Sequence, residues 1–392
     1  MSMPGGVALL LDSCPAGWSS QEEFHARLAA ALGERGIPTV TVFSGEPAPV
    51  SRRKFEAAGA AVAVLPYHGP SPGYVRSLCG LLEKHAVSLV HLRYYCYFSL
   101  LPWLARIAGA RSIVLTDANS GEWQPRPIRG TLVRLRTRLA TAPVSRAITV
   151  SEFVRGRLVS AGVNRDKIVT VHNGVDTRRY RPDAGARARA REAFGVGDGE
   201  IAVSTMAVLR PWKHPEVVIE AVAKAARDRS LPVKLLFGGD GPMRADLVKL
   251  SAKLGIQDRV VWVGYTRQPW TVYHASDIFA FASEGEAFGY VLAEAMACGV
   301  PVVAARSGAI PEIVEHGRSG LLAPANDPRA FADNIAALAG DEALRKRFGA
   351  AAARRARRLF DVETAVANTL AVYDSLERQP SGSLRQCVSA PL

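Results

Sequence analysis

The chain has 392 residues, of which 48% are hydrophobic and 22% charged, so it is long enough for two or three domains and too apolar for wholesale disorder. Lys and Arg outnumber Asp and Glu by 49 to 36, a net charge of +13. Residues 1–180 hold 22 basic and 12 acidic side chains, whereas residues 181–392 hold 27 and 24. The excess therefore belongs mostly to the first half and indicates nucleic acid, a membrane surface or an anionic substrate as a partner.

No apolar run reaches the ~18 residues of a transmembrane helix, and the first six residues lack the basic region of a signal peptide. The cysteines are scattered and lack CxxC spacing, at positions 14, 79, 96, 298 and 387. We therefore expect a cytoplasmic protein with neither a disulfide framework nor a structural zinc site.

Short β-branched segments alternate with amphipathic stretches through the first half of the chain. Segments 7–11, 39–43, 61–65, 88–91, 111–116 and 147–150 are expected to form buried strands. The clearest helical stretch is 20–35, where Ser20 and Glu23 have the spacing of a capping box and Gly36 marks the end.

The same alternation starts again after a linker-like segment, 180–185. Strands are expected at 201–208, 233–237, 260–263, 278–281 and 300–304, followed by nearly continuous helix over 328–378 and a flexible tail over 379–392. The pattern predicts an α/β fold with parallel sheets covered on both faces, in two domains, 1–180 and 181–360. Ligands of such proteins lie in the cleft that faces the carboxyl ends of the strands.

The most informative stretch follows the predicted strand 278–281. A polar, Gly-containing turn leads into a short helix that starts at about Gly289. The amides of Gly289, Tyr290 and Val291 then lie at a helix N-terminus, which is a favourable place for an anion. Glu286 precedes this helix and Glu294 lies within it, and their carboxylates suit the hydroxyl groups of a sugar, which donate hydrogen bonds to them.

This stretch resembles the glutamate-x7-glutamate signature of retaining GT-B glycosyltransferases of family 4. Other segments match the family in the expected order over most of 145–325. They are Ser151-Glu152, Asn173-Gly174-Val175-Asp176, residues 238–242, Gly264 and residues 308–312.

The resemblance implies a GT-B fold of two doubly wound, Rossmann-like domains facing a cleft. The first domain would bind the acceptor and the second a nucleotide-diphospho-sugar of the UDP or GDP type, with a helix within 361–378 crossing back to the first domain. Glu294 would hold the ribose hydroxyls and Glu286 the hydroxyls of the transferred sugar. The other donor-binding positions implied are Phe288, Gly289, Tyr290, Val291, Gly17, Gly239 and Gly264.

Phosphate-binding side chains are expected on the loop after the strand 201–208. Lys213 matches the family's phosphate-binding lysine, and Arg210 stands two places after the usual arginine position, which Val208 occupies here. With the helix N-terminus, these cations would stabilise the leaving diphosphate without a metal or other cofactor. No Asp-x-Asp occurs in the chain. The family implies retention by front-face attack, with a leaving phosphate oxygen taking the acceptor proton.

The first half departs from the family at two places. Of the Gly-rich loop between the first strand and the first helix, only Gly17 is present. Relatives often carry a His after the strand that ends here at Thr116, whereas this chain has Asp117-Ala118-Asn119. Asp117 or Asn119 is therefore the candidate for the catalytic position, and a catalytically silent relative is an alternative.

An arginine-rich segment, 126–146, has no acidic residue between positions 123 and 151. Its apolar residues Ile128, Leu132, Leu135 and Leu139 recur at helical spacing, which predicts a basic amphipathic helix. Two interpretations stay open: a domain helix with a solvated basic face, or a helix that docks on anionic lipid headgroups.

We therefore expect a hexosyltransferase that acts on a lipid-linked or other glycoconjugate acceptor, in the cytoplasm or peripherally on the inner face of the membrane. A sugar-nucleotide epimerase- or hydrolase-like GT-B enzyme is the alternative. Nucleic acid is not expected as a partner, because the basic residues form no recognisable nucleic-acid-binding motif. The sugar, the base and the oligomeric state stay open.

Overall fold

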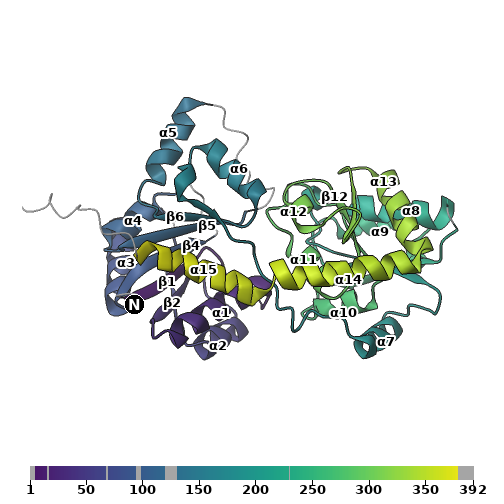
Figure 1. The fold of residues 1–392 in the computed structure, drawn as a ribbon, viewed down its shortest axis with the longest axis horizontal. Coiled ribbons are helices and arrows are strands. Elements are labelled where there is room, and N and C mark those ends of the chain that lie inside the picture. The colour runs from purple at the N-terminus through teal and green to yellow at the C-terminus, as the bar shows by residue number, and fades with distance from the viewer. Residues whose placement is uncertain are drawn as a thin grey trace, which may run out of the picture.

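The computed structural model describes residues 5–15, 17–67, 69–93, 99–119, 130–228 and 230–377. Within them, a seven-stranded sheet has the order β3-β2-β1-β4-β5-β6-β7 and a six-stranded sheet the order β10-β9-β8-β11-β12-β13. All the strand pairs are parallel. Figure 1 shows the sheets in two lobes. The predicted α/β class with two doubly wound domains is confirmed.

The first sheet consists of β1 (Gly6–Leu11), β2 (Thr39–Phe43), β3 (Ala61–Val64), β4 (Val87–Arg93), β5 (Ser112–Asp117), β6 (Arg146–Thr149) and β7 (Ile168–Thr170). The second consists of β8 (Ile201–Met206), β9 (Val233–Gly238), β10 (Val260–Gly264), β11 (Ile278–Phe281), β12 (Val302–Ala305) and β13 (Gly320–Ala323). Central strands such as β1 and β11 are buried along their whole length, as expected where helices cover both faces of a sheet.

The helices of the first lobe are α1 (Ser20–Glu34), α2 (Pro49–Ala57), α3 (Pro72–Lys84), α4 (Leu101–Ile107), α5 (Thr131–Ala140), α6 (Glu152–Ala161) and the short η2 (Arg165–Lys167). Those of the second are α7 (Ala184–Ala193), η3 (Pro211–Lys213), α8 (Pro215–Asp228), α9 (Arg244–Lys253), η4 (Gln257–Arg259), α10 (Pro269–Ala275), α11 (Tyr290–Ala297), α12 (Ile310–Ile313), α13 (Pro328–Gly340) and α14 (Glu342–Leu359). The last helix is α15 (Val362–Glu377).

The C-terminal helical region is divided into three helices rather than being nearly continuous. The side chain of Asp341 caps α14 by accepting a hydrogen bond from the amide of Leu344, which separates α14 from α13. A second break at Phe360 and Asp361 separates α14 from α15, and Figure 1 shows these two helices running from one lobe to the other. The tail predicted for 379–392 lies outside the described residues.

The chain passes between the lobes along two adjacent segments. The amide of Val175 donates to the carbonyl of Phe360 (2.8 Å), and the amide of Val362 donates to the carbonyl of Val175 (3.0 Å). Beyond this crossing, apolar residues of α15 such as Val366 and Tyr373 join the core formed by β1 and α1. The final helix therefore belongs to the hydrophobic core of the first lobe.

None of the helices in the described ranges is long and apolar enough to cross a bilayer.

Candidate active site

A cavity of about 700 Å³ lies between the lobes, where the loops after β1, β8, β9 and β10 meet α1 and α11. It therefore faces the carboxyl ends of strands from both sheets, which is where parallel α/β proteins bind ligands. Its lining residues include Gly17, Trp18, Ser20, Glu23 and Lys54 from the first lobe and Met206, Gly239, Tyr265, Trp270, Tyr273, Tyr290, Val291 and Glu294 from the second.

Glu294 lies on α11 at the base of this cleft and is 7% exposed. One carboxylate oxygen accepts a hydrogen bond from Ser20 Oγ (2.6 Å) and the other from Tyr273 Oη (2.9 Å). Burial raises the pKa of this carboxyl, and hydrogen bonds from Ser20, Tyr273 and Tyr180 oppose that shift. Because Ser20 belongs to the first lobe, the glutamate joins both sides of the cleft through its acceptor oxygens.

The start of α1 explains why Ser20 is available to Glu294. Ser19, and not Ser20, is the N-cap: its hydroxyl accepts from the amide of Gln21 (3.1 Å), and its own amide donates to Glu22 (2.9 Å). The predicted capping box was therefore wrong by one position. This shift leaves Ser20 for Glu294, and Glu23 accepts from the indole of Trp18 (2.7 Å).

Glu286 follows β11 and is 4% exposed. Its Oε1 atom accepts hydrogen bonds from Ser283 Oγ (2.8 Å) and from the ammonium group of Lys213, which ends η3. The salt bridge with Lys213 joins the loop after β8 to the loop after β11, and both loops lie at the carboxyl edge of the second sheet. The structure therefore places the predicted sugar-binding carboxylate beside the predicted phosphate-binding cation.

The other predicted site residues on the loops after β8 and β11 differ in how exposed they are. Arg210 is exposed, and its guanidinium lies 5.2 Å from the ring centroid of Trp212. Gly289 is the N-cap of α11, and Tyr290 and Val291 line the cavity. Phe288 is 2% exposed and its ring packs against Phe360 at a centroid distance of 5.5 Å, so only its backbone is available to a ligand.

The predicted glycines shape the cleft. Gly17 lines it opposite Tyr265, whose hydroxyl would lie 3.1 Å from a Cβ at this position. Gly239 has a φ of +104°, and a Cβ there would stand 1.8 Å from the carbonyl oxygen of Ala207, so a side chain does not fit. Its amide donates to the carbonyl of Gly264 (2.8 Å), which ties the loops after β9 and β10 together.

Asp117 ends β5 and is buried, with 2% of its surface exposed. Its carboxylate pairs with Arg157 of α6 (2.9 Å) and accepts a hydrogen bond from the amide of Asn119 (3.1 Å). The neighbouring Ala118 packs against the hydrophobic cluster that contains Val150 and Val154 of the first lobe and continues into the second. These contacts give Asp117 a structural role, and its catalytic role stays a prediction.

Several cleft residues were not predicted from the sequence. The aromatic rings of Trp18, Tyr265, Trp270 and Tyr273 line the cavity, and the ammonium of Lys54 lies 4.3 Å from the ring centroid of Trp18. Tyr265 directly follows β10, and Trp18 lies in the loop between β1 and α1. A position after a strand was the signal available for these two residues. Lys54 and Tyr273 lie within helices, where no local pattern marks a ligand site.

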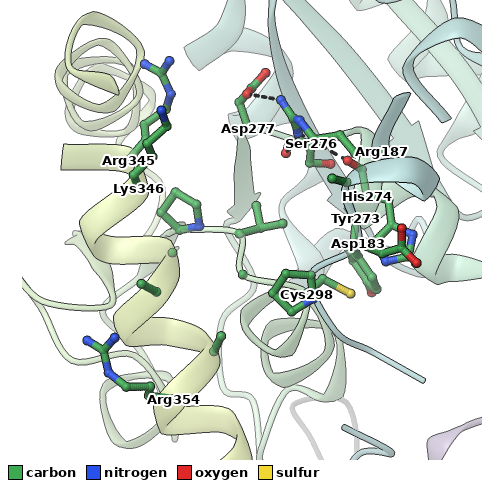
Figure 2. A pocket seen from close by; sticks show the side chains of 18 of the residues that line it. Asp183, Arg187, Tyr273, His274, Ser276, Asp277, Cys298, Arg345, Lys346 and Arg354 are labelled. Atoms are coloured by element: carbon green, nitrogen blue, oxygen red, sulfur yellow. Dashed lines mark hydrogen bonds and ion pairs between the residues drawn. The ribbon is translucent and has the colours of Figure 1, made fainter. Parts of the chain in front are cut away.

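A second cavity, of about 720 Å³, lies at the amino ends of β11 and β12 and shares Tyr273 with the cleft. Figure 2 shows Arg187 turned toward Asp277 beside this cavity. The two side chains form an ion pair with an N–O distance of 2.7 Å. Lys346 is likewise paired with Glu342 (2.7 Å). Because these charges are matched within the protein, and because the cavity lies at the opposite edge of the sheet, we assign the site to the cleft. No cluster of three or more metal-binding side chains occurs among the described residues.

The chain matches two family models and is similar to known proteins. Residues 186–355 match the model of "Glycosyl transferases group 1", and residues 21–179 match "Glycosyltransferase Family 4". The chain is 33% identical over 282 residues to a GDP-mannose-dependent alpha-(1-6)-phosphatidylinositol monomannoside mannosyltransferase of Mycolicibacterium smegmatis, covering 69% of this chain and 72% of that protein. It is 39% identical over 198 residues to a D-inositol 3-phosphate glycosyltransferase of Nocardia farcinica, covering 48% of this chain and 43% of that protein.

Solved structures share the fold across nearly the whole chain. The crystal structure of Anabaena Alr3699/HepE in complex with UDP has a TM-score of 0.79 at 22% identity, covering 94% of this chain and all (100%) of that one. A glycosyltransferase from Rickettsia africae has a TM-score of 0.82 at 19% identity, covering 96% of this chain and 100% of that one. At these identities, the likeness establishes the fold alone.

Proposed function

Because this chain belongs to glycosyltransferase family 4 and has its two-domain GT-B fold, we propose that it is a retaining hexosyltransferase that uses a UDP- or GDP-sugar. The observation that carries the proposal is a pair of buried carboxylates at the carboxyl edge of the second sheet: Glu294, which lines the cleft, and Glu286, which follows β11. Each is held by hydroxyl or ammonium donors. The hydroxyl donors among them are of the kind that a sugar or ribose presents to a carboxylate.

Glu294 suits the ribose of the donor. In this structure, Ser20 and Tyr273 donate hydroxyl hydrogens to its two oxygens, which is the arrangement that a ribose diol reproduces. The aromatic residues of the cleft, Tyr265 and Trp270, provide apolar surfaces beside it for a base. We therefore propose that the nucleoside occupies the cavity, with the diphosphate directed toward the N-terminus of α11.

Lys213 suits the diphosphate. Cleavage of the anomeric bond leaves negative charge on the diphosphate, and a positioned ammonium group together with helix amides stabilises that charge. Lys213 is 17% exposed at its side chain and is already oriented by Glu286. In the proposed complex, the same carboxylate accepts from hydroxyls of the sugar while Lys213 contacts the leaving group, so the pair aligns the bond that breaks. The proposed reaction assigns no role to a metal ion.

The acceptor would be anionic or held at a lipid surface. The excess positive charge lies in residues 1–180, which form the lobe opposite the proposed donor site. The relatives named above act on phosphatidylinositol monomannoside and inositol 3-phosphate, which both carry phosphate. A phosphate-bearing acceptor of this chain would account for the positive excess of residues 1–180. Such an acceptor would lie at the inner face of a membrane or free in the cytoplasm.

The donor class is tested by thermal denaturation in the presence of UDP-, GDP- and ADP-sugars. One nucleotide-sugar is expected to raise the Tm of the wild type by mass action. The shift should be lost in Glu294→Gln and kept in Glu83→Gln, because Glu83 is exposed on α3, away from the cleft. If no nucleotide-sugar stabilises the wild type, the proposal is wrong at its first step.

The reaction class is tested with the stabilising donor in the absence of an acceptor. A transferase should release nucleotide slowly without an acceptor and faster when a phosphate-bearing glycoside or lipid acceptor is added. NMR of the product should show that the transferred sugar keeps the anomeric configuration it had in the donor. Rapid release of nucleotide and altered free sugar without an acceptor would instead establish a hydrolase- or epimerase-like enzyme.

A further inference from the structure

Helix α5 (Thr131–Ala140) turns its apolar side away from the protein. Leu132, Leu135 and Leu139 are 78%, 52% and 59% exposed, and their spacing places them in one stripe along the helix. The buried residues of α5 are the small Thr137 and Ala140. An amphipathic helix on a globular protein normally turns such a stripe toward the core, so this orientation is the reverse of the usual one.

Close backbone packing fixes this orientation. A Cβ on Gly162, at the end of α6, would stand 2.7 Å from the carbonyl oxygen of Arg134, so the backbones of α5 and α6 meet here without an intervening side chain. At about 100° per residue, Arg134 and Thr137 lie on the side opposite the leucines, and Ala140 lies at the edge of that side. Figure 1 shows α5 at the outer edge of the first lobe.

Helix α4 (Leu101–Ile107) extends the apolar surface. Leu100, Trp103 and Ile107 are 48%, 41% and 66% exposed, and the indole of Trp103 donates to the carbonyl of Leu139 (2.9 Å), so the two helices touch. Among the described residues, ten large hydrophobic side chains are exposed, and six of them lie on this surface. We call it the α4–α5 face, formed by Leu100, Trp103, Ile107, Leu132, Leu135 and Leu139. A gathering of this kind marks an interaction site.

Basic residues surround the α4–α5 face. Arg136 and Arg138 are exposed, and at about 100° per residue they lie on either side of the leucine stripe. Residues 99–119 and 130–151 together hold six arginines and one acidic residue, Asp117, which is buried and paired with Arg157. Burial, and then the charges of Arg106 and Arg146, lower the pKa of Lys167, so these three cations lie near one another.

We propose that the α4–α5 face docks on an anionic lipid bilayer, with its leucines and Trp103 in the interface and its arginines against the lipid phosphates. Apolar residues flanked by arginines on one exposed helix are typical of interfacial membrane binding. Symmetric pairing with a second copy would bring these arginines together and is therefore disfavoured. The exposure of the leucine side of α5 favours the second of the two interpretations left open by the sequence, a helix that docks on anionic lipid headgroups. Arg126, Ile128 and Arg129 of the same segment lie outside the described residues.

The inference is tested by sedimentation of the full chain with vesicles of phosphatidylcholine alone or mixed with phosphatidylglycerol. Binding is expected only to the mixed vesicles and should weaken as salt is raised. Replacing Arg136 and Arg138 by Gln should lower the partition coefficient about fivefold each, or about 25-fold together. Replacing the three leucines of α5 by Gln should lower it further still. Since all five side chains are exposed, the Tm of these variants should match the wild type.

Matched control variants distinguish an effect of the α4–α5 face from an effect of exposed charge or apolar surface elsewhere on the protein. Arg354→Gln with Arg357→Gln removes two exposed arginines from α14, and Val248→Gln removes an exposed apolar residue from α9; neither should change vesicle binding. Trp103 fluorescence should shift to the blue on the mixed vesicles, and Trp103→Phe should remove that change.

The proposal is overturned if the wild type does not bind anionic vesicles. It is also overturned if the α14 arginine variant loses as much vesicle binding as the α5 arginine variant, or if the leucine variant binds vesicles as tightly as the wild type. It is also overturned if the wild type sediments as a dimer in the absence of lipid and the leucine variant as a monomer, since the face would then join two copies. Loss of vesicle binding with an unchanged donor-induced Tm shift supports the docking and leaves the proposed reaction unaffected.

Discussion

Ser20 and Glu294 are separated by 274 positions in the chain, but Ser20 Oγ lies 2.6 Å from Glu294 Oε1 in the structure. Glu286 and Glu294 could be predicted as site candidates because they lie around a helix start that follows a predicted strand, and Lys213 because it matches the family's phosphate-binding lysine. Ser20 and Tyr273 could not, because their contact with Glu294 depends on how a helix of one lobe and a helix of the other are packed. Their sequence surroundings give only a helix start and an ordinary aromatic position.

Gly239 gives a test at the scale of one residue. A Cβ at Gly239 would overlap the carbonyl of Ala207, so Gly239→Ala should destabilise the second lobe by about 2 kcal/mol or more and displace the loop that lines the cleft. Gly80 lies inside α3 with no atom within 4 Å of its added Cβ, so Gly80→Ala should stabilise the protein by about 0.5–1 kcal/mol.

Urea denaturation of both glycine variants measures these changes, with donor-induced stabilisation as a second readout. Equal stabilities of the two variants would mean that the close approach at Gly239 does not constrain the loop.

At the scale of elements, β-branched runs located the central strands to within a residue or two. The short edge strands β7 and β13 were missed, because three or four residues carry too little pattern to stand out. The helical period of 132–139 was correct, but period alone does not say which side of a helix faces the core. The contact of α5 with α6 decides that, and it is a property of packing.

The docking of α15 on the first lobe depends on a neutral histidine. His91 Nδ1 lies 2.6 Å from Tyr373 Oη, and its Nε2 lies 2.6 Å from Thr116 Oγ1. Burial, and then Arg93, lower the pKa of His91 to about 3 from the usual 6.5. As pH falls below 6.5, the unfolded chain takes up this proton while the folded chain does not. Stability should therefore decline over that range, down to about pH 3, by at most about 1.4 kcal/mol per pH unit.

His91→Gln removes that titrating group and keeps a polar side chain of similar length. Its free energy of unfolding, measured in urea, should be lower than the wild type's at neutral pH but should fall less between pH 6.5 and 5.5. His25, another buried histidine with a lowered pKa, remains in both proteins and leaves a residual slope. An identical acid dependence in the two proteins would mean that His91 does not couple protonation to folding.

At the scale of the whole molecule, the two lobes meet at the site itself. Ser20 of the first lobe donates a hydrogen bond to Glu294 of the second, and the two segments that cross between the lobes are hydrogen-bonded to each other at Val175 and Val362. The basic charge lies in the lobe that also carries the α4–α5 face, whereas the proposed donor site lies mostly in the other. A membrane-facing acceptor lobe and a nucleotide-binding lobe joined at Glu294 would divide the two substrates between the halves of the chain.

Protonation of Glu294 should weaken donor binding. Because burial raises its pKa above the usual 4.5, the carboxylate takes up a proton at a higher pH than an ordinary glutamate. A protonated carboxyl accepts fewer hydrogen bonds from the ribose. Donor affinity should therefore be constant at higher pH and fall as pH is lowered through this raised pKa. The diester phosphates of a nucleotide-sugar stay ionised over that range.

The most direct test of the account is calorimetric titration of the stabilising nucleotide-sugar into wild type, Glu294→Gln and the exposed control Glu83→Gln. Hydrogen bonds to a charged group contribute about 1.5–3 kcal/mol, so Glu294→Gln should raise Kd by about tenfold or more and lose the acid dependence, while the control binds like the wild type. Equal affinity and equal pH dependence of wild type and Glu294→Gln would contradict the assignment of this cleft as the donor site.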